Sequence, residues 1–137
     1  MRTALDTNVL SALWSNEPAA VKLAMKLGNA RQDGALTVSA PVYAESIAHP
    51  TFSEASINTF LSETGISVDF DISAEAWLEA GRRYSKYAAR RRRTVAQESK
   101  RLLADFIIGA HALVHADRFM TLDPGRYKRD FPELKLF

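Results

Sequence analysis

The sequence predicts an α/β protein, a three-layer α/β/α sandwich with a central parallel sheet. Short apolar strands alternate with helical segments along the chain, and this alternation is typical of parallel strands joined by helices. The 137 residues are enough for one domain with a substantial core, and we expect a single domain over residues 1–137. The 47% hydrophobic and 25% charged residues are typical of a folded globular protein.

The first half of the chain contains short apolar runs that predict strands, at residues 2–5, 35–39 and 66–70. Between them, apolar residues recur at helical spacing and predict helices, at residues 7–14, 17–33, 40–50 and 53–65. Pro18 fits the first turn of the second helix, and Ser39 can cap the third. Pro50 ends that helix, and Gly65 closes the fourth.

The second half begins with a long helix that starts near Ser73 and runs towards a cluster of arginines. Its predicted inner face consists of small and aromatic residues, namely Trp77, Ala80, Gly81, Tyr84 and Ala88. Residues 90–101 are polar and predict an exposed bend or loop. An apolar helix is predicted at residues 102–116 and a strand at residues 118–122. A turn at Pro124 and Gly125 and a last edge strand at residues 134–137 complete the chain.

The composition excludes several classes of protein. The absence of cysteine excludes disulfides, thiolate catalysis and cysteine zinc sites. No apolar run approaches the roughly 20 residues of a membrane span. The first strand begins almost at Met1, so we expect no secretory signal and a cytoplasmic location.

Acidic residues lie near the ends of the predicted strands, where the active sites of such folds gather. Four of them are each the lone acid in an apolar neighbourhood: Asp6, Glu45, Asp105 and Asp123. At about 5 Å and an effective dielectric near 20, each pair of such charges would cost roughly 3 kcal/mol. The four acids therefore lie apart, share protons or hold a divalent cation.

Each acid also has an ordinary structural explanation when it is taken alone. Asp6 can cap the helix that follows it, and Asp105 can complement the dipole of its own helix. Asp123 precedes Pro-Gly and is a common turn residue. Glu45 is the hardest to explain in this way, because it lies within a helix among apolar residues.

The segments around these acids resemble a known family in their chain order. "LDTNVL", "VYAE", "ADFIIGAHAL" and "TLD" are similar to motifs of the PIN domain, and more narrowly to the compact bacterial ribonuclease toxins of the VapC type. The resemblance implies a PIN-like fold and RNA cleavage, with Asp6, Glu45, Asp105 and Asp123 as catalytic residues that bind Mg²⁺ or Mn²⁺. It implies that Asn8 and Thr121 support this cluster. It also implies a homodimer and a cognate antitoxin protein as partner.

The basic residues are concentrated in one segment. Residues 82–101 contain nine basic residues and one acidic residue, a net charge of +8 against +2 for the whole chain. Arginine binds phosphate well because its planar fork can contact two oxygens. We therefore predict that a run of four arginines contacts the RNA backbone, namely Arg90, Arg91, Arg92 and Arg93, with an acidic partner protein as the main alternative. This run belongs to no signature of the family.

Other functions are compatible with parts of the sequence. His111 and His115 are four residues apart on one predicted helix and could cleave RNA without metal, although packed histidines suit this apolar helix better. A dehalogenase-like phosphatase would need an aspartate where Asn8 stands, and a receiver-like domain would need paired acids after the first strand. A catalytically inactive module that binds RNA through Arg90–Arg93 remains the principal alternative.

Overall fold

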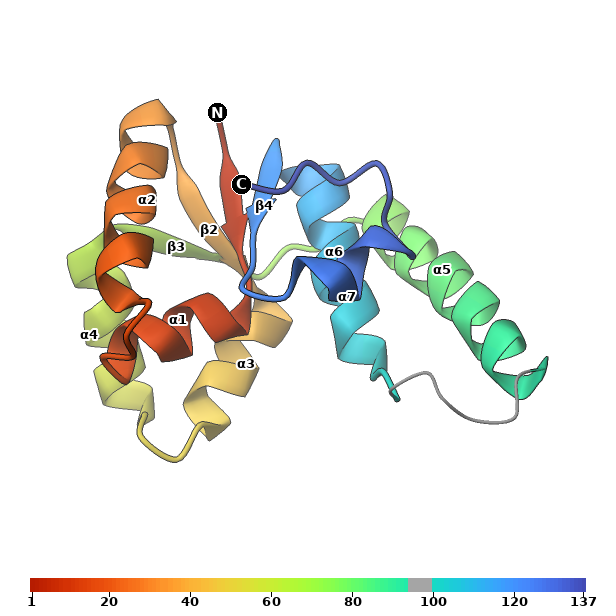
Figure 1. Ribbon diagram of the computed structural model, residues 1–137, viewed down its shortest axis with the longest axis horizontal. Helices are drawn as coiled ribbons and strands as arrows, with labels where there is room; N and C mark the ends of the chain where they lie inside the picture. The colour runs from red at the N-terminus through yellow and green to blue at the C-terminus, as the bar shows by residue number, and fades with distance from the viewer. Residues whose placement is uncertain (94–99) are drawn as a thin grey trace.

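The computed structural model describes residues 1–93 and 100–137. Its centre is a parallel sheet with strand order β3-β2-β1-β4, formed by β1 (Thr3–Leu5), β2 (Leu36–Ser39), β3 (Ile66–Asp69) and β4 (Arg118–Met120) (Figure 1). The predicted α/β class and its parallel sheet are confirmed. Each strand is shorter than the apolar run that predicted it.

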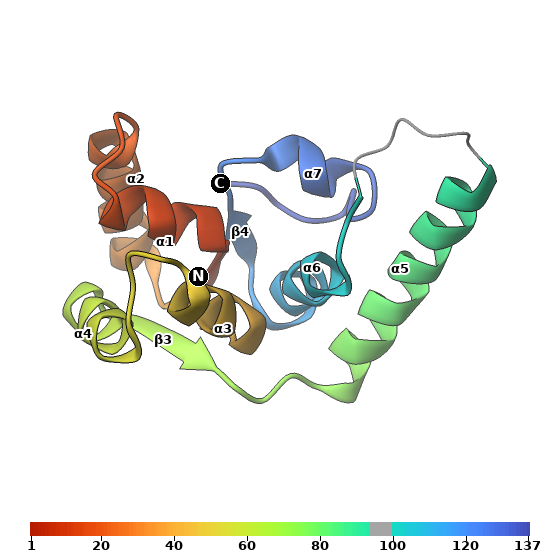
Figure 2. The same cartoon turned by 90° about the horizontal axis from the view of Figure 1, so that it is seen from below.

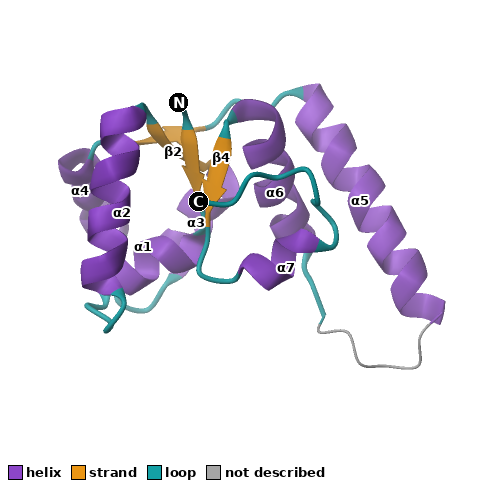
Figure 3. Cartoon of the chain, turned by 45° about the horizontal axis from the view of Figure 1, so that its top comes forward, coloured by secondary structure: helices purple, strands orange, loops and turns teal. Residues whose placement is uncertain are grey.

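The helices of the described residues are α1 (Thr7–Trp14), α2 (Ala20–Asp33), α3 (Ala40–Ala48), α4 (Glu54–Thr64), α5 (Ala74–Arg93), α6 (Leu103–His115) and α7 (Pro124–Lys128). Helices α1, α2 and α7 lie on one side of the sheet and α3 and α6 on the other (Figures 1 and 2). Helix α5 packs along α6 and extends away from the strands, which lie among the helices (Figure 3). None of the helices in the described ranges is long and apolar enough to span a bilayer.

The core lies on both faces of the sheet, because every strand of a parallel sheet is covered by crossover helices. Leu5, Val38 and Phe119 come from three different strands and are almost completely buried. Ala4 pairs with Thr37 and with Phe119, so the carboxyl ends of neighbouring strands are level. The residues that follow β1, β2 and β4 therefore meet at one edge of the sheet.

The buried face of α5 differs from the predicted one. Trp77 is 50% exposed and Gly81 is exposed as well, so these two predictions are wrong. The buried residues of the helix are Ala76, Ala80 and Tyr87. The cause is that α5 packs mainly against α6, which covers one narrow stripe and leaves large apolar side chains outside it.

The arginine run is helical, so the predicted bend at this position is wrong. Arg90–Arg93 form the last turn of α5, and residues 94–99 of the same prediction lie outside the described residues. Arginine is a good helix former, and positive side chains at the carboxyl end of a helix are stabilised by the helix dipole. Both effects favour continuing the helix through this run.

Other local predictions also need correction, and one is Pro18, which lies before α2 and not in its first turn, because this helix begins at Ala20. Ser39 occupies the N-cap position of α3, but its hydroxyl makes no capping bond and has no hydrogen-bond partner among the described residues. Pro124 and Gly125 begin the short helix α7 and not a simple turn, since proline suits the first turn of a helix. The predicted last strand is reduced to one parallel bridge between Phe119 and Leu136.

Candidate active site

Asp6 lies directly after β1 and is held at the carboxyl edge of the sheet. Its Oδ1 accepts a hydrogen bond of 2.8 Å from the backbone N–H of Thr7, so the residue caps α1 as its position predicts. Its Oδ2 accepts hydrogen bonds from the hydroxyls of Thr121, at 2.8 Å, and Tyr127, at 3.1 Å. The residue is only 6% exposed. Burial raises the pKa of Asp6 despite these three donors.

Glu45 reaches the same edge from α3. Its Oε1 accepts a hydrogen bond of 2.7 Å from the hydroxyl of Thr7, the residue next to Asp6. Burial raises the pKa of Glu45, and the negative charges of Asp105 and Asp6 raise it further. The mid-helix glutamate that had no evident partner in the sequence is thus paired with the first residue of α1.

Asp105 approaches from the first turn of α6. Its Oδ2 accepts a hydrogen bond of 3.2 Å from the backbone N–H of Leu102 and forms an ion pair of 3.5 Å with Arg126 on α7. Its charge also raises the pKa of Asp6. The structure therefore brings the three carboxylates of Asp6, Glu45 and Asp105 into one electrostatic cluster, below referred to as the carboxylate cluster. The helices that carry or follow them gather at the centre of the view in Figure 2.

Asn8 and Thr121 join the two chain segments beside the carboxylate cluster. The side-chain amide of Asn8 donates to the hydroxyl of Thr121 at 3.3 Å, and its Oδ1 accepts from the backbone N–H of Leu122 at 3.1 Å. Thr121 also accepts from the backbone N–H of Asp123 at 3.1 Å. This network fixes the segment after β4 against the start of α1.

Asp123 lies at the border of this arrangement. It is the N-cap residue of α7, it is exposed, and its carboxylate makes no capping hydrogen bond. Its backbone is fixed next to Thr121, whereas no contact between its carboxylate and the carboxylate cluster is found among the described residues. The structure thus gathers three of the four predicted acids and leaves the fourth beside them.

Three residues of the site escaped the sequence reasoning: Thr7, Arg126 and Tyr127. Thr7 was expected only as the first residue of a helix, although it directly follows Asp6. Arg126 and Tyr127 lie just after a Pro-Gly pair that predicted a turn, so no signal indicated side chains directed at the acids. Burial raises the pKa of the Tyr127 hydroxyl, which therefore stays protonated and donates a hydrogen bond to Asp6.

The donor chemistry of the carboxylate cluster suits a hard divalent cation. Carboxylate oxygens are the ligands that Mg²⁺ and Mn²⁺ prefer, and a cation would offset the cost of burying Asp6. The buried hydroxyl of Ser39, which lacks a partner among the described residues, lies at the same edge of the sheet. As the side chains stand, no three Asp, Glu or His residues of the ranges 1–93 and 100–137 are arranged to share one ion. Glu45 and Asp105 are instead turned towards Thr7 and Arg126.

Arg90 and the histidines contact groups outside the carboxylate cluster. Arg90 forms an ion pair of 3.2 Å with the buried carboxylate of Asp130, while Arg91–Arg93 are exposed. His111 is 1% exposed and lies 3.0 Å from Asp69. His115 accepts a hydrogen bond from a backbone N–H at the start of α5. Both histidines are therefore packing residues in this structure, as the apolar helix predicted.

Comparison with known families gives one match that covers almost the whole chain. The model of the PIN domain family matches residues 3–132. This chain is a PIN domain protein.

Solved structures with the same fold accompany this match. One is the VapBC2 complex of Rickettsia felis bound to a DNA fragment from its promoter, with a TM-score of 0.73 and 20% identity over 100% of this chain and 98% of that one. Another is VapBC-1 of nontypeable Haemophilus influenzae, with a TM-score of 0.67 and 22% identity over 100% and 97%. At this identity the likeness concerns the fold. The comparison with curated protein sequences found no match.

Proposed function

We propose that this PIN domain is a metal-dependent endoribonuclease that acts as the VapC-type toxin of a toxin–antitoxin pair. The observation that supports this most is the convergence of Asp6, Glu45 and Asp105 at the carboxyl edge of the sheet, where burial and mutual repulsion raise the pKa of two of them. Such a cluster costs stability unless something positive binds to it. The two similar solved structures, both of VapBC proteins, support the toxin assignment.

Asp6, Glu45 and Asp105 would hold Mg²⁺ or Mn²⁺ in this proposal, and Asp123 would hold a second ion or orient the attacking water. When bound, such an ion lowers the pKa of water and neutralises charge on the phosphoryl oxygens. Thr121 and Tyr127 keep the Asp6 carboxylate in one orientation through their hydroxyl groups. Thr7 positions Glu45, and its release of this glutamate would accompany binding of the cation.

Arg126 has a defined role in the same proposal. It balances the charge of Asp105 across 3.5 Å, and its charge lowers the pKa of Glu45. With a cation on the carboxylates, the guanidinium would be available to a phosphate oxygen of the RNA. The proposed products carry a 5′ phosphate and a 3′ hydroxyl, because water would attack the phosphorus and the bond to the 3′ oxygen would break, with this oxygen leaving as the hydroxyl.

The partners are proposals of the same kind. A cognate antitoxin protein would silence the toxin by covering its site, a homodimer would be the form in solution, and the location would be cytoplasmic. Co-expression with the neighbouring reading frame, followed by light scattering of the purified protein, measures both associations. A protein that is monomeric and binds no product of that frame would contradict them.

The deciding experiment is cleavage of a mixed RNA pool by purified protein with Mg²⁺, Mn²⁺ or EDTA, followed by analysis of the product ends. Asp6→Asn should abolish cleavage, whereas Asp71→Asn, which makes the same chemical change at an exposed acid, should not. Ends with a 2′,3′-cyclic phosphate would contradict attack by water. RNA binding without cleavage by either protein would favour the second candidate, an inactive PIN-like module that binds RNA through Arg90–Arg93.

A further inference from the structure

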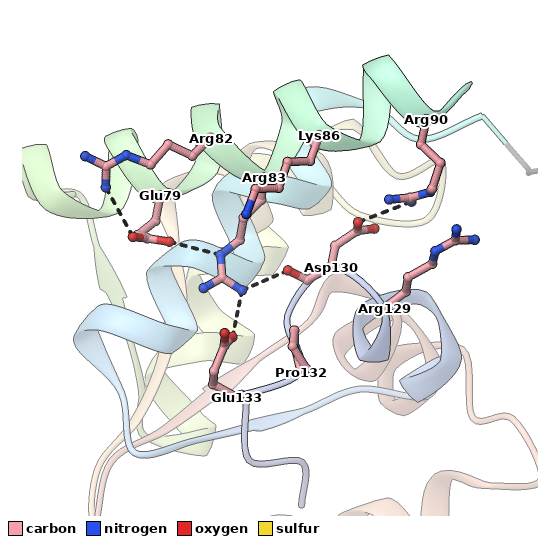
Figure 4. Close-up of a pocket in the computed structure, with 9 residues that line it drawn as sticks. All are labelled: Glu79, Arg82, Arg83, Lys86, Arg90, Arg129, Asp130, Pro132 and Glu133. Atoms are coloured by element: carbon pink, nitrogen blue, oxygen red, sulfur yellow. Dashed lines mark hydrogen bonds and ion pairs between the residues drawn. The ribbon is translucent and has the colours of Figure 1, made fainter. Parts of the chain in front are cut away.

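A cavity of about 420 Å³ lies between α5 and residues 129–133, outside the carboxylate cluster (Figure 4). Five basic and three acidic side chains line it, which gives its wall a net charge of +2. Its volume falls in the range of about 300–1,000 Å³ that is usual for small-ligand sites. Neither the family match nor the proposed cleavage chemistry accounts for it.

Arg83 is the most firmly held cation of this wall. Its guanidinium donates to Glu79 at 3.0 Å, to Glu133 at 2.7 Å and to the backbone carbonyl of Asp130 at 2.8 Å (Figure 4). It also lies over the ring of Phe131, 4.8 Å from the centroid. Two of the three acidic side chains are thus directed at Arg83, and they fix it in place.

Asp130, the third acid, is shared by two cations. Its side chain is 4% exposed, with Oδ1 at 3.2 Å from Arg90 and Oδ2 at 3.1 Å from Arg101. One buried negative charge therefore anchors two guanidinium groups from different segments of the chain. All three acids of the wall are thus paired with arginines, and the basic side chains still outnumber them.

The cations on the helical side of the cavity form a row. Arg82, Lys86 and Arg90 are four residues apart along α5, and this spacing places them on one face of the helix. The side chain of Arg82 is 61% exposed, although it also contacts Glu79. Successive positions of such a row are about 5–6 Å apart, so they offer repeated positive charge to an extended anion.

Helix α7 connects this cavity with the carboxylate cluster. Arg126 forms the ion pair with Asp105, and Arg129, three residues further along, lines the cavity. Residues three apart lie on the same side of a helix, and one such step advances about 4.5 Å along its axis. Arg126 and Arg129 therefore place one cation beside the acids and another at the cavity.

We propose that this cavity is a phosphate-binding subsite that holds a backbone phosphate of the RNA a few nucleotides from the cleaved bond. This proposal rests on the proposed function for the identity of the nucleic acid. Arginine forks bind phosphate oxygens in pairs, and here the carboxylates of Glu79, Glu133 and the buried Asp130 position the forks before any ligand arrives. An RNA strand carries its charges at regular intervals, which matches a row of cations that leads to the proposed cleavage site. An acidic protein segment is the other class of ligand that the test must distinguish.

The test is RNA binding by the full chain in EDTA, where no cleavage occurs, with a labelled single-stranded RNA at several salt concentrations. The double variant Arg82→Gln/Lys86→Gln removes two charges from the cavity. The double variant Lys22→Gln/Lys26→Gln removes two charges from α2, at the opposite end of the molecule (Figure 1). All four residues project from helices, and circular dichroism of each variant verifies that the helices persist.

The cavity variant should bind RNA on the order of tenfold more weakly, because charge-assisted hydrogen bonds are lost. Its slope of log affinity against log salt should decrease by about 0.7 for each lost phosphate contact. The α2 variant should match the wild-type protein, and Arg82→Lys/Lys86→Arg should retain most of the affinity. Equal binding and equal slopes for both double variants would overturn the proposal.

Two further outcomes separate the alternatives. If the cavity variant keeps its RNA affinity and loses affinity for a polyglutamate peptide, the cavity serves an acidic protein segment and the phosphate assignment is wrong. If the cavity variant loses RNA affinity while the wild-type protein never cuts RNA with Mg²⁺ or Mn²⁺, the subsite is supported and the proposed function fails. The binding and cleavage results are therefore independent of each other.

Discussion

Replacing Asp6 by asparagine should stabilise the protein without metal and remove the stabilisation that metal provides. Burial raises the pKa of Asp6 in the native state above its ordinary value of 3.8. The unfolded chain therefore releases this proton at a lower pH than the native chain does. As the pH rises from the unfolded pKa through the native one, the native state loses stability. Asparagine stays neutral, so its native state avoids this loss.

The substitution itself keeps two of the three hydrogen-bonding positions of Asp6. The carbonyl oxygen of asparagine can accept the Thr7 N–H at 2.8 Å, and the hydroxyl of Tyr127 can accept from its amide. The hydroxyl of Thr121 already accepts from Asn8 and Asp123, so its hydrogen bond to position 6 is lost. Because about 1 kcal/mol shifts the Tm of a domain of this size by roughly 3–5 °C, we expect removal of the buried charge to appear as an increase of a few degrees at pH 7.

Thermal unfolding followed by circular dichroism measures both effects. In EDTA the Tm of Asp6→Asn should exceed that of the wild type at pH 7, and the difference should vanish as the pH falls below 3.8. Mn²⁺ at about 100 times its Kd should stabilise the wild type by roughly 2.7 kcal/mol and the variant far less. Asp71→Asn controls for the loss of an exposed charge. A lower Tm for Asp6→Asn in EDTA at pH 7 would refute the reasoning from burial.

Three further substitutions test the packing and the ion pairs by unfolding in urea. Gly109→Ala should lower the free energy of unfolding by about 1–3 kcal/mol, because a Cβ there would lie 2.6 Å from the ring of Phe131. An unchanged urea midpoint would show that this ring moves aside. Asp130→Asn should lower the free energy of unfolding by about 3 kcal/mol, because two partly buried guanidiniums lose their shared carboxylate. A decrease below about 1 kcal/mol would contradict the anchoring role of Asp130. Burial lowers the pKa of His111 below its ordinary value of 6.5, so protonation of this residue should destabilise the fold as the pH falls through that value. His111→Gln should therefore weaken the pH dependence between pH 7 and 5, and a profile parallel to that of the wild type would contradict this.

The parts of the fold that follow from short-range rules could be predicted from the sequence. Gly65 ends α4 in a left-handed conformation with φ of 71°, as a glycine after a helix predicts. Asp6 caps α1 as its position after a strand indicates. Asp105 and Glu45 stood out for a related reason, since an acid among apolar residues requires a partner, and both have one here.

The parts that depend on distant neighbours could not be predicted. Trp77 is exposed because α5 packs mainly against one helix, α6, which covers only part of its surface. The sequence of α5 does not indicate how many elements pack against it. Arg90 continues the helix and pairs with Asp130, forty residues away in the chain. Tyr127 reaches Asp6 because it packs against Phe119 of β4, and a Pro-Gly pair does not predict this long-range contact.

The hydrogen bonds of Asp6 determine how many ligands it can still accept. Each carboxylate oxygen has two lone pairs, and Oδ2 uses both of them for the hydroxyls of Thr121 and Tyr127. Oδ1 uses one for the N–H of Thr7 and keeps one. Asp6 therefore offers a single acceptor position, so it can act as a one-oxygen ligand but not as a two-oxygen chelate or as a bridge between two ions.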